Sequence, residues 1–262
     1  FGMINGIESK GIGASPKHFA VNNQETSRNW NDAIVSERAL RELYLKSFEI
    51  IVKESQPWAI MTSYNKINGT YAAENKRLLT DILRNKWGFE GLVMTDWYGG
   101  RNSTNIIKSG NDLIEPGTKN DWENLKKSAL NGSLPLLNID ESVKRILTLV
   151  LKSQKMKNHN FDNNPKLKEH ALVTRKAGSE GIILLKNSNT LPLKDINNIA
   201  LFGSTSYEFI SGGTGSGDVA EAYTISLDEA LKKNGFQINE IAEQEYIRQN
   251  LKSPKQNEQS GG

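Results

Sequence analysis

The sequence contains no cysteine and only three histidines among its 262 residues. Without thiols the chain forms neither disulfide bonds nor thiolate metal sites, and it has no cysteine nucleophile. A zinc site built from histidines would need nearly all of His18, His159 and His170, and their spacing matches no ligand pattern. The sequence therefore predicts no metal site.

A strong charge bias and long apolar runs are also lacking. The 33 Lys and Arg residues are interleaved with 30 Asp and Glu residues, and the net charge of +3 is too small and scattered to indicate a nucleic-acid partner. The longest apolar runs, such as 182–185, fall far short of the ~18 residues that a membrane-spanning helix needs. The chain opens on Phe1 rather than methionine. We therefore expect the natural N-terminus to lie upstream, and localisation and oligomeric state stay open.

Short apolar segments alternate with amphipathic ones over residues 14–114, which predicts an α/β fold with a parallel sheet. The segment GLVMT at 91–95 is nearly all apolar, as in a strand that is buried on both faces. The elements expected here are strands at 14–20, 58–62 and 91–95 and helices at 35–53 and 74–86. The stripe expected to face the core from the first helix consists of Leu40, Tyr44, Ser47 and Ile51.

A polar stretch at 158–165 predicts a linker between a domain at 1–157 and a second domain at 166–262. Before the linker we expect helices at 122–130 and 139–156. The apolar run GIILLK at 181–186 predicts a buried strand at the start of a second α/β unit. The other elements expected in this unit are helices at 167–180 and 226–234 and strands at 198–203 and 236–239.

Polar side chains follow three of the expected strands. Asp96 ends the strand 91–95, Lys17 and His18 lie at the end of 14–20, and Tyr64 follows 58–62. Because reactive groups of parallel α/β folds gather at the carboxyl ends of strands, these side chains are candidates for one site. Taken singly, each also has a simpler role, with Asp96 as a helix N-cap and the others in loops or in packing.

The candidates around Asp96 suit a polyol ligand, because they donate hydrogen bonds to hydroxyl groups. Trp97, which follows Asp96 directly, has a ring that can cover a sugar. Lys17, His18 and Arg28 are also expected to keep Asp96 ionised through their positive charge. As a set, the candidate donors Lys17, His18, Arg28 and Tyr64 favour a sugar-binding site.

The glycine-rich segment 212–217 (GGTGSG) could be taken for a phosphate-binding loop. It lacks the Lys-Ser/Thr ending of a P-loop, and its glycines do not follow the dinucleotide-binding pattern. We therefore expect a flexible loop here instead of a nucleotide site.

Several segments resemble bacterial β-glucosidases of glycoside hydrolase family 3. In the first half these are KHFAVNNQETSRN (17–29), SERALRELYLKSFE (36–49), MTSYNKINGTYAAEN (61–75) and GFEGLVMTDWYGG (88–100). The segments RKAGSEGIILLKN (175–187), LPL (191–193) and GGTGSGD (212–218) are similar to the start of that family's second domain. The resemblance implies part of a (β/α)8 barrel over 1–157 and the beginning of an α/β sandwich over 166–262. It also implies a retaining hydrolase that releases nonreducing terminal β-D-glucose from β-glucosides or oligosaccharides.

The resemblance also implies the roles of individual residues. Asp96 matches the family's nucleophile, Trp97 the ring beside the sugar, and Met61 a residue that lines the same pocket. Such enzymes need neither a metal nor an organic cofactor. The residues that match those holding the sugar's hydroxyl groups are Lys17, His18, Arg28 and Tyr64.

The chain departs from the family pattern in two ways. It has Glu115 where the family usually has a methionine before Pro-Gly. The family's acid/base glutamate and the first part of its barrel match nothing here, and Glu25, Glu37 and Glu74 are expected on loops or helices that do not replace that glutamate. We therefore expect an internal fragment that is inactive by itself on an aryl β-glucoside.

Other activities remain as alternatives. A β-xylosidase or another exo-β-glycosidase of the same family stays open, because the choice of sugar depends on segments that this chain does not contain. A β-N-acetylglucosaminidase is disfavoured, since residues 20–23 (AVNN) stand where such enzymes carry Pro-Gly-His-Gly. A catalytically inactive carbohydrate-binding homologue is disfavoured by the presence of Asp96 and its expected sugar-binding neighbours.

Overall fold

The computed structural model describes residues 1–213 and 215–252. The chain divides into two compact units, Phe1–Asn164 and a second that begins at Pro165, and each is described by itself. Among the described residues, no helix is both long enough and apolar enough to cross a membrane.

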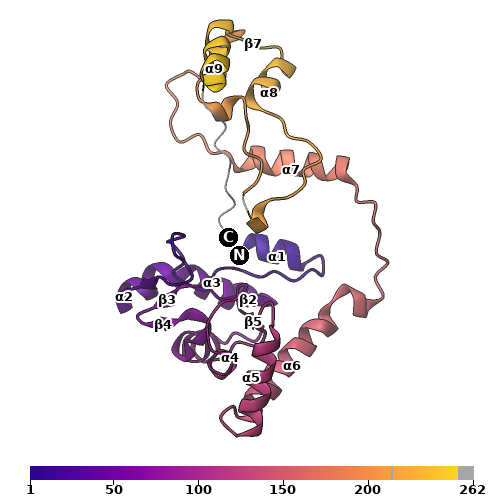
Figure 1. The fold of residues 1–262 in the computed structure, drawn as a ribbon. Helices are drawn as coiled ribbons and strands as arrows, with labels where there is room; N and C mark the ends of the chain where they lie inside the picture. The colour runs from indigo at the N-terminus through magenta and orange to yellow at the C-terminus, as the bar shows by residue number, and fades with distance from the viewer. Residues whose placement is uncertain (214, 253–262) are drawn as a thin grey trace. The chain divides into compact units, whose positions relative to one another are not determined.

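The first unit consists of short strands and helices in alternation (Figure 1). Its helical elements are α1 (Gly2–Glu8), α2 (Glu37–Ala39), the π-helical turn η1 (Leu40–Tyr44), α3 (Lys46–Ser55), the 3-10 turn η2 (Ala72–Glu74), the π-helical η3 (Arg77–Lys86), α4 (Ser103–Lys108), α5 (Lys119–Leu130), α6 (Leu136–Lys152) and the 3-10 turn η4 (Gln154–Lys157). Its strands are β1 (Asp32–Ala33), β2 (Ala59–Met61), β3 (Lys66–Ile67), β4 (Thr70–Tyr71) and β5 (Leu92–Met94).

Parallel pairing of β2 with β5 is the centre of this unit and confirms the predicted parallel sheet. The register aligns Ala59 with Leu92 and Met61 with Met94, and the two strands lie side by side in Figure 1. Single parallel bridges from Phe19 to Thr62 and from Met94 to Leu113 add a segment on each side. Four chain segments therefore run in the same direction, and their carboxyl ends lie along one edge.

The segment 14–20 is not the regular strand that the sequence predicted. The carbonyls of Ala14 and Pro16 accept hydrogen bonds from the N–H groups of Ala59 and Met61, at 3.2 Å each. Proline has no N–H to return to the neighbouring strand, so the ladder is broken at Pro16. Only Phe19 forms a complete bridge.

The helical segment 37–55 confirms the first half of the predicted stripe and departs from the second half. The N–H of Leu45 donates to the carbonyl of Leu40 at 2.9 Å, a π-type turn that inserts one extra residue. Leu40 is buried and Tyr44 packs against the core as predicted, but beyond them the buried positions are Leu45 and Val52 instead of Ser47 and Ile51. These buried side chains join Phe19 and others in one hydrophobic core around β2 and β5.

The second unit has little regular structure. Its elements are α7 (Leu167–Gly181), β6 (Asn198–Ile199), the 3-10 turns η5 (Ser204–Ser206) and η6 (Gly215–Gly217), α8 (Leu227–Lys233), β7 (Gln237–Ile238) and α9 (Glu240–Lys252). β6 and β7 pair in parallel. In the glycine-rich segment 212–217 the N–H of Gly213 donates to the carbonyl of Gly217. The prediction for this loop includes Thr214, which lies outside the described residues, as do residues 253–262.

The predicted buried strand at 181–186 is wrong. Ile182, Ile183 and Leu185 are 80%, 77% and 92% exposed, and the segment has no regular secondary structure. None of the strands in the described part of the chain pairs with it. An apolar run forms a buried strand only where neighbouring strands take its backbone hydrogen bonds, and those neighbours are not found here.

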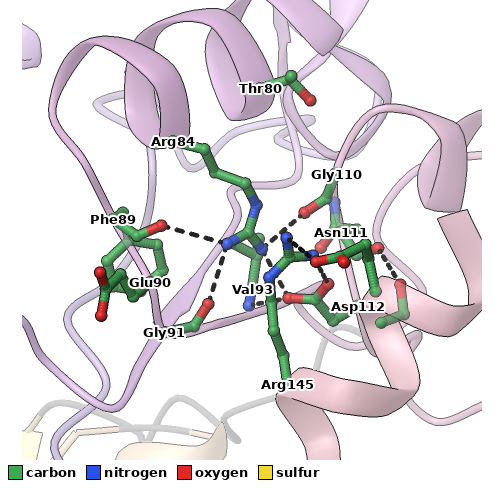
Figure 2. Close-up of polar contacts among 12 residues, drawn as sticks. Thr80, Arg84, Phe89, Glu90, Gly91, Val93, Gly110, Asn111, Asp112 and Arg145 are labelled. Atoms are coloured by element: carbon green, nitrogen blue, oxygen red, sulfur yellow. Dashed lines mark hydrogen bonds and ion pairs between the residues drawn. The ribbon is translucent and has the colours of Figure 1, made fainter. Parts of the chain in front are cut away.

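A buried ion cluster fastens β5 to the surrounding helices. Asp112, whose side chain is fully buried, accepts hydrogen bonds from Arg84 at 2.6 Å and from Arg145 at 2.9 Å. The same carboxylate accepts the backbone N–H of Val93 in β5 at 2.8 Å. Figure 2 shows the two guanidinium groups converging on Asp112, with Arg84 also reaching the carbonyls of Phe89, Gly91 and Gly110. The cluster therefore joins η3, α6 and β5 through one carboxylate.

We predict that Asp112→Ala lowers the free energy of unfolding by about 3–5 kcal/mol, because it leaves the buried charge of Arg84 without its partner. Urea unfolding of the chain measures this loss. The matched control is Glu42→Ala, which removes a pair with Arg38, a side chain that is 84% exposed. The control is expected to cost at most about 1 kcal/mol. Equal losses in the two variants would contradict the role of the cluster.

Candidate active site

Asp96 lies just beyond the carboxyl end of β5, in a tight turn. The N–H of Gly99 donates to the carbonyl of Asp96 at 2.9 Å. A Cβ atom on Gly99 would lie only 3.0 Å from that carbonyl, so a larger residue would crowd the turn. Tyr98 has a φ of 60°, and its N–H donates to the carbonyl of Glu115 at 2.8 Å. The turn is thus held by its own backbone and by the segment that follows the Leu113 bridge.

Three donors converge on the carboxylate of Asp96. The hydroxyl of Tyr64 and the backbone N–H of Trp97 donate to Oδ1 at 2.9 Å and 2.8 Å. The Nε2 atom of His18 lies 3.1 Å from Oδ2. Asp96 is buried, with 8% of its surface exposed. Each carboxylate oxygen therefore has a partner while the group remains reachable from solvent.

These contacts set the pKa of Asp96. Partial burial is the largest single influence and raises the pKa, because it disfavours the charged form. The hydrogen bonds from His18, the Trp97 N–H and Tyr64 together outweigh burial and hold the pKa of Asp96 below its ordinary value. The carboxylate is therefore ionised at neutral pH.

Tyr64 is held as a neutral donor. Its burial and its hydrogen bond to Asp96 raise the pKa of Tyr64 to about 12, so the phenol keeps its proton at physiological pH. The guanidinium carbon of Arg28 lies 4.6 Å from the centre of the Tyr64 ring, and Arg28 is paired with Glu25 at 2.8 Å. Arg28 thus touches the site through the Tyr64 ring.

The loops that carry His18 and Tyr64 are tied together by buried polar contacts. The carbonyl of Ala20 accepts hydrogen bonds from the hydroxyl of Ser63 at 2.7 Å and from the amide of Asn65 at 3.2 Å. Ser63 and Asn65 are fully buried. This clamp fixes the two loops on either side of Asp96.

The structure brings together some of the predicted site residues. Asp96, His18, Tyr64 and Trp97 are in direct contact. Lys17 is exposed, and in the described part of the chain no hydrogen bond or ion pair joins it to Asp96. The expectation that Lys17, His18 and Arg28 keep Asp96 ionised is confirmed for His18, and it is corrected for Lys17 and Arg28, since the other main influences that lower the pKa are the Trp97 N–H and Tyr64.

Met61 was predicted to belong to the site, whereas the contact of the Trp97 N–H was not predicted. Met61 lies half-buried on β2, opposite Met94. The donation from the backbone N–H of Trp97 was not predicted, since every residue except proline has this group and no sequence pattern marks it. Among residues 1–213 and 215–252, no group of three His, Asp or Glu side chains is arranged to hold a metal ion.

We predict that Tyr64→Phe raises the pKa of Asp96, because it removes one of the hydrogen bonds that favour the charged form. The carboxyl carbon of Asp96, followed by NMR during a pH titration, reports this directly. The midpoint of the Asp96 titration should therefore move to higher pH. Tyr71→Phe removes a hydroxyl that donates to the carbonyl of Asn29 instead, and this control should leave the titration of Asp96 unchanged.

The family described as Glycosyl hydrolase family 3 N terminal domain matches residues 1–149. A β-glucosidase of Rhizobium radiobacter is 39% identical over 239 residues, which are 87% of this chain and 29% of the relative. An exo-α-(1->6)-L-arabinopyranosidase of Bifidobacterium longum is 41% identical over 196 residues, which are 73% of this chain and 25% of the relative.

Solved structures give the same result. β-Glucosidase 3B from Thermotoga neapolitana, in complex with α-D-glucose, is 44% identical with a TM-score of 0.87, over 95% of this chain and 36% of that one. The chain thus spans less than a third of the length of the two relatives named above. The resemblance seen in the sequence motifs is confirmed, and the chain belongs to glycosyl hydrolase family 3.

Proposed function

We propose that the protein containing this chain is a retaining glycosidase that releases nonreducing terminal β-D-glucose from β-glucosides, with Asp96 as its nucleophile. The observation that carries the proposal is the ionised carboxylate of Asp96, which three donors hold at the end of β5. Family membership and relatives named β-glucosidase support the choice of reaction.

The geometry supports nucleophilic attack by Asp96. An oxygen of Asp96 forms a bond to the anomeric carbon while the bond from that carbon to the leaving oxygen breaks. A retaining enzyme also needs a second carboxyl group, about 5–5.5 Å from the first, to protonate that oxygen and then to activate water. In this proposal a glutamate outside residues 1–262 supplies it. The same donors that keep Asp96 ionised also hold it in one orientation.

The remaining site residues are assigned to the sugar. Trp97 is 57% exposed beside the carboxylate, so its ring is free to cover one face of the glucose. His18 lies against Asp96 and is placed to share a hydroxyl with it. Lys17 and Arg28 extend the set of donors outward, and Met61 lines the pocket from β2.

We also propose the architecture of the whole protein. The four parallel segments around β2 and β5 form part of a (β/α)8 barrel over 1–157, since active residues of such barrels lie at the carboxyl ends of the strands. Residues 158–165 link it to 166–262, the beginning of an α/β sandwich domain. The division into two units near residue 164 supports this boundary.

For the identity of the sugar, one of the relatives points to a specific alternative. The relative from Bifidobacterium longum is named an exo-α-(1->6)-L-arabinopyranosidase. Comparing the rates on aryl β-glucoside, β-xyloside and α-L-arabinopyranoside decides between glucose and the smaller sugars, and a binding homologue would cleave none of them.

We predict that a 2-deoxy-2-fluoro-β-glucoside labels Asp96, as peptide mass spectrometry of the whole protein will show. Asp96→Ala should lower turnover by roughly 10⁴-fold or more while the melting temperature stays nearly unchanged, because the nucleophile is lost and β5 is not. Label on a different carboxylate would refute the assignment of the nucleophile.

We predict that Lys17→Met lowers kcat/KM by about 10- to 100-fold for every aglycone tested, because a hydrogen bond to a charged group contributes about 1.5–3 kcal/mol. Exchanging the leaving group should not alter that factor. A variant that changed only the preference among aglycones would place Lys17 in a different subsite.

A further inference from the structure

Arg101 lies in the loop that leads from Asp96 to α4, and its guanidinium binds three backbone carbonyls. Its Nη1 atom donates to Gly100 at 2.8 Å and to Tyr98 at 3.3 Å. Its Nη2 atom donates to Asn29 at 3.0 Å. Two of these carbonyls belong to the turn after Asp96, and the third directly follows Arg28 in the chain. One side chain therefore joins two loops that are 72 residues apart.

Aromatic rings and a carboxylate hold Arg101 in place. Its guanidinium carbon lies 4.4 Å from the ring centre of Trp30 and 5.1 Å from that of Tyr71. The carboxylate of Glu74 accepts the backbone N–H groups of Arg101 at 2.6 Å and of Asn102 at 3.1 Å. The guanidinium thus lies within cation–π distance of two rings, while the backbone of Arg101 is fixed just before α4.

The turn that Arg101 holds is one that needs external support. Tyr98 has a φ of 60°, which costs free energy for a residue with a bulky side chain. Its N–H is taken by Glu115 and its carbonyl by Arg101. Without the Arg101 contacts, Tyr98 would keep only the hydrogen bond from its N–H to Glu115.

Arg101 also links both sides of the carboxylate. On one side it holds the turn that contains Trp97, whose N–H donates to Asp96. On the other side it holds Asn29, next to Arg28, which covers the ring of Tyr64, and Tyr64 donates to Asp96. The contacts therefore form a continuous series that starts at Asp96, passes through Arg101 and returns to Asp96 through Tyr64.

We propose that Arg101 is a positioning residue, which keeps the Asp96 turn and the Arg28 loop in the geometry that attack on the anomeric carbon requires. The inference rests on the proposed function. It assigns to Arg101 a role through backbone contacts, because three of its five guanidinium N–H groups donate to the carbonyls of Gly100, Tyr98 and Asn29.

The test measures how fast the whole protein is trapped by 2,4-dinitrophenyl 2-deoxy-2-fluoro-β-glucoside. In this step a bond forms from Asp96 to the anomeric carbon, and dinitrophenolate departs with the electron pair of the broken bond. Dinitrophenolate leaves without a proton, so the rate reports the nucleophile rather than the acid. Saturation kinetics separate the trapping rate constant from the dissociation constant of the reagent.

Arg101→Met should lower the trapping rate constant by about 10- to 100-fold, because small misplacements of a reacting group cost about that much. The dissociation constant should change less than about threefold. The matched control is Arg38→Met, at a side chain that is 84% exposed and paired with Glu42, and it should change neither constant. Trp30→Leu should lower the trapping rate constant less than Arg101→Met does, because the three carbonyl contacts remain.

An unchanged trapping rate in Arg101→Met, with the wild type labelled at Asp96, would overturn the inference and leave the proposed function standing. A higher dissociation constant of the reagent at an unchanged trapping rate would make Arg101 a substrate-binding residue, which also overturns the inference. No labelling of the wild type at Asp96 would refute the proposed function itself. Should Arg101→Met fail to fold, Arg101→Lys, which keeps the charge without the planar fork, is judged by the same criterion.

Discussion

Parallel pairing of β2 with β5 is the constraint on which the rest of the first unit depends. Strands that run in the same direction end at the same edge, so groups that are far apart in sequence meet there. Asp96 follows β5, Tyr64 follows β2, and His18 belongs to the segment that pairs with the far side of β2. Their contacts within 3.1 Å are a consequence of register, since a shift of one residue would turn each side chain to the other face of the sheet.

Two buried carboxylates near β5 are stabilised in contrasting ways. Asp112 is neutralised by two arginines and a backbone N–H, and its side chain is completely enclosed. Asp96 receives a phenol, a backbone N–H and an imidazole, and 11% of its side chain stays exposed. A carboxylate between two guanidinium groups is a poor nucleophile because its charge is fully engaged. The arrangement at Asp96 keeps the charge while leaving it available.

The sequence anticipated the elements better than their details. Periodicity located η3, because the helical spacing of its apolar residues is a local feature of the sequence, and all four of them are buried. In the helical segment 37–55 it placed Leu40 and Tyr44 correctly, but the π-type turn at Leu45 changed the register of the buried face beyond them. It also failed at 181–186, where strand formation depends on partners that a local pattern does not reveal. In the site, His18, Tyr64 and Asp96 could be found by their positions after strands. The N–H of Trp97 and the contact of the Arg101 guanidinium with the Trp30 ring could not, because main-chain donors and long-range contacts leave no local pattern.

Glu115 supports the turn after Asp96 through its main chain and not through its side chain. Its N–H donates to the hydroxyl of Thr95 at 2.8 Å, and its carbonyl accepts the N–H of Tyr98. Both contacts use the main chain, so the turn after Asp96 keeps its support whichever side chain residue 115 carries. A glutamate can therefore replace the methionine that is usual in the family while the backbone stays in place. The side chain at position 115 can therefore change without removing either main-chain support of the turn beside the candidate nucleophile.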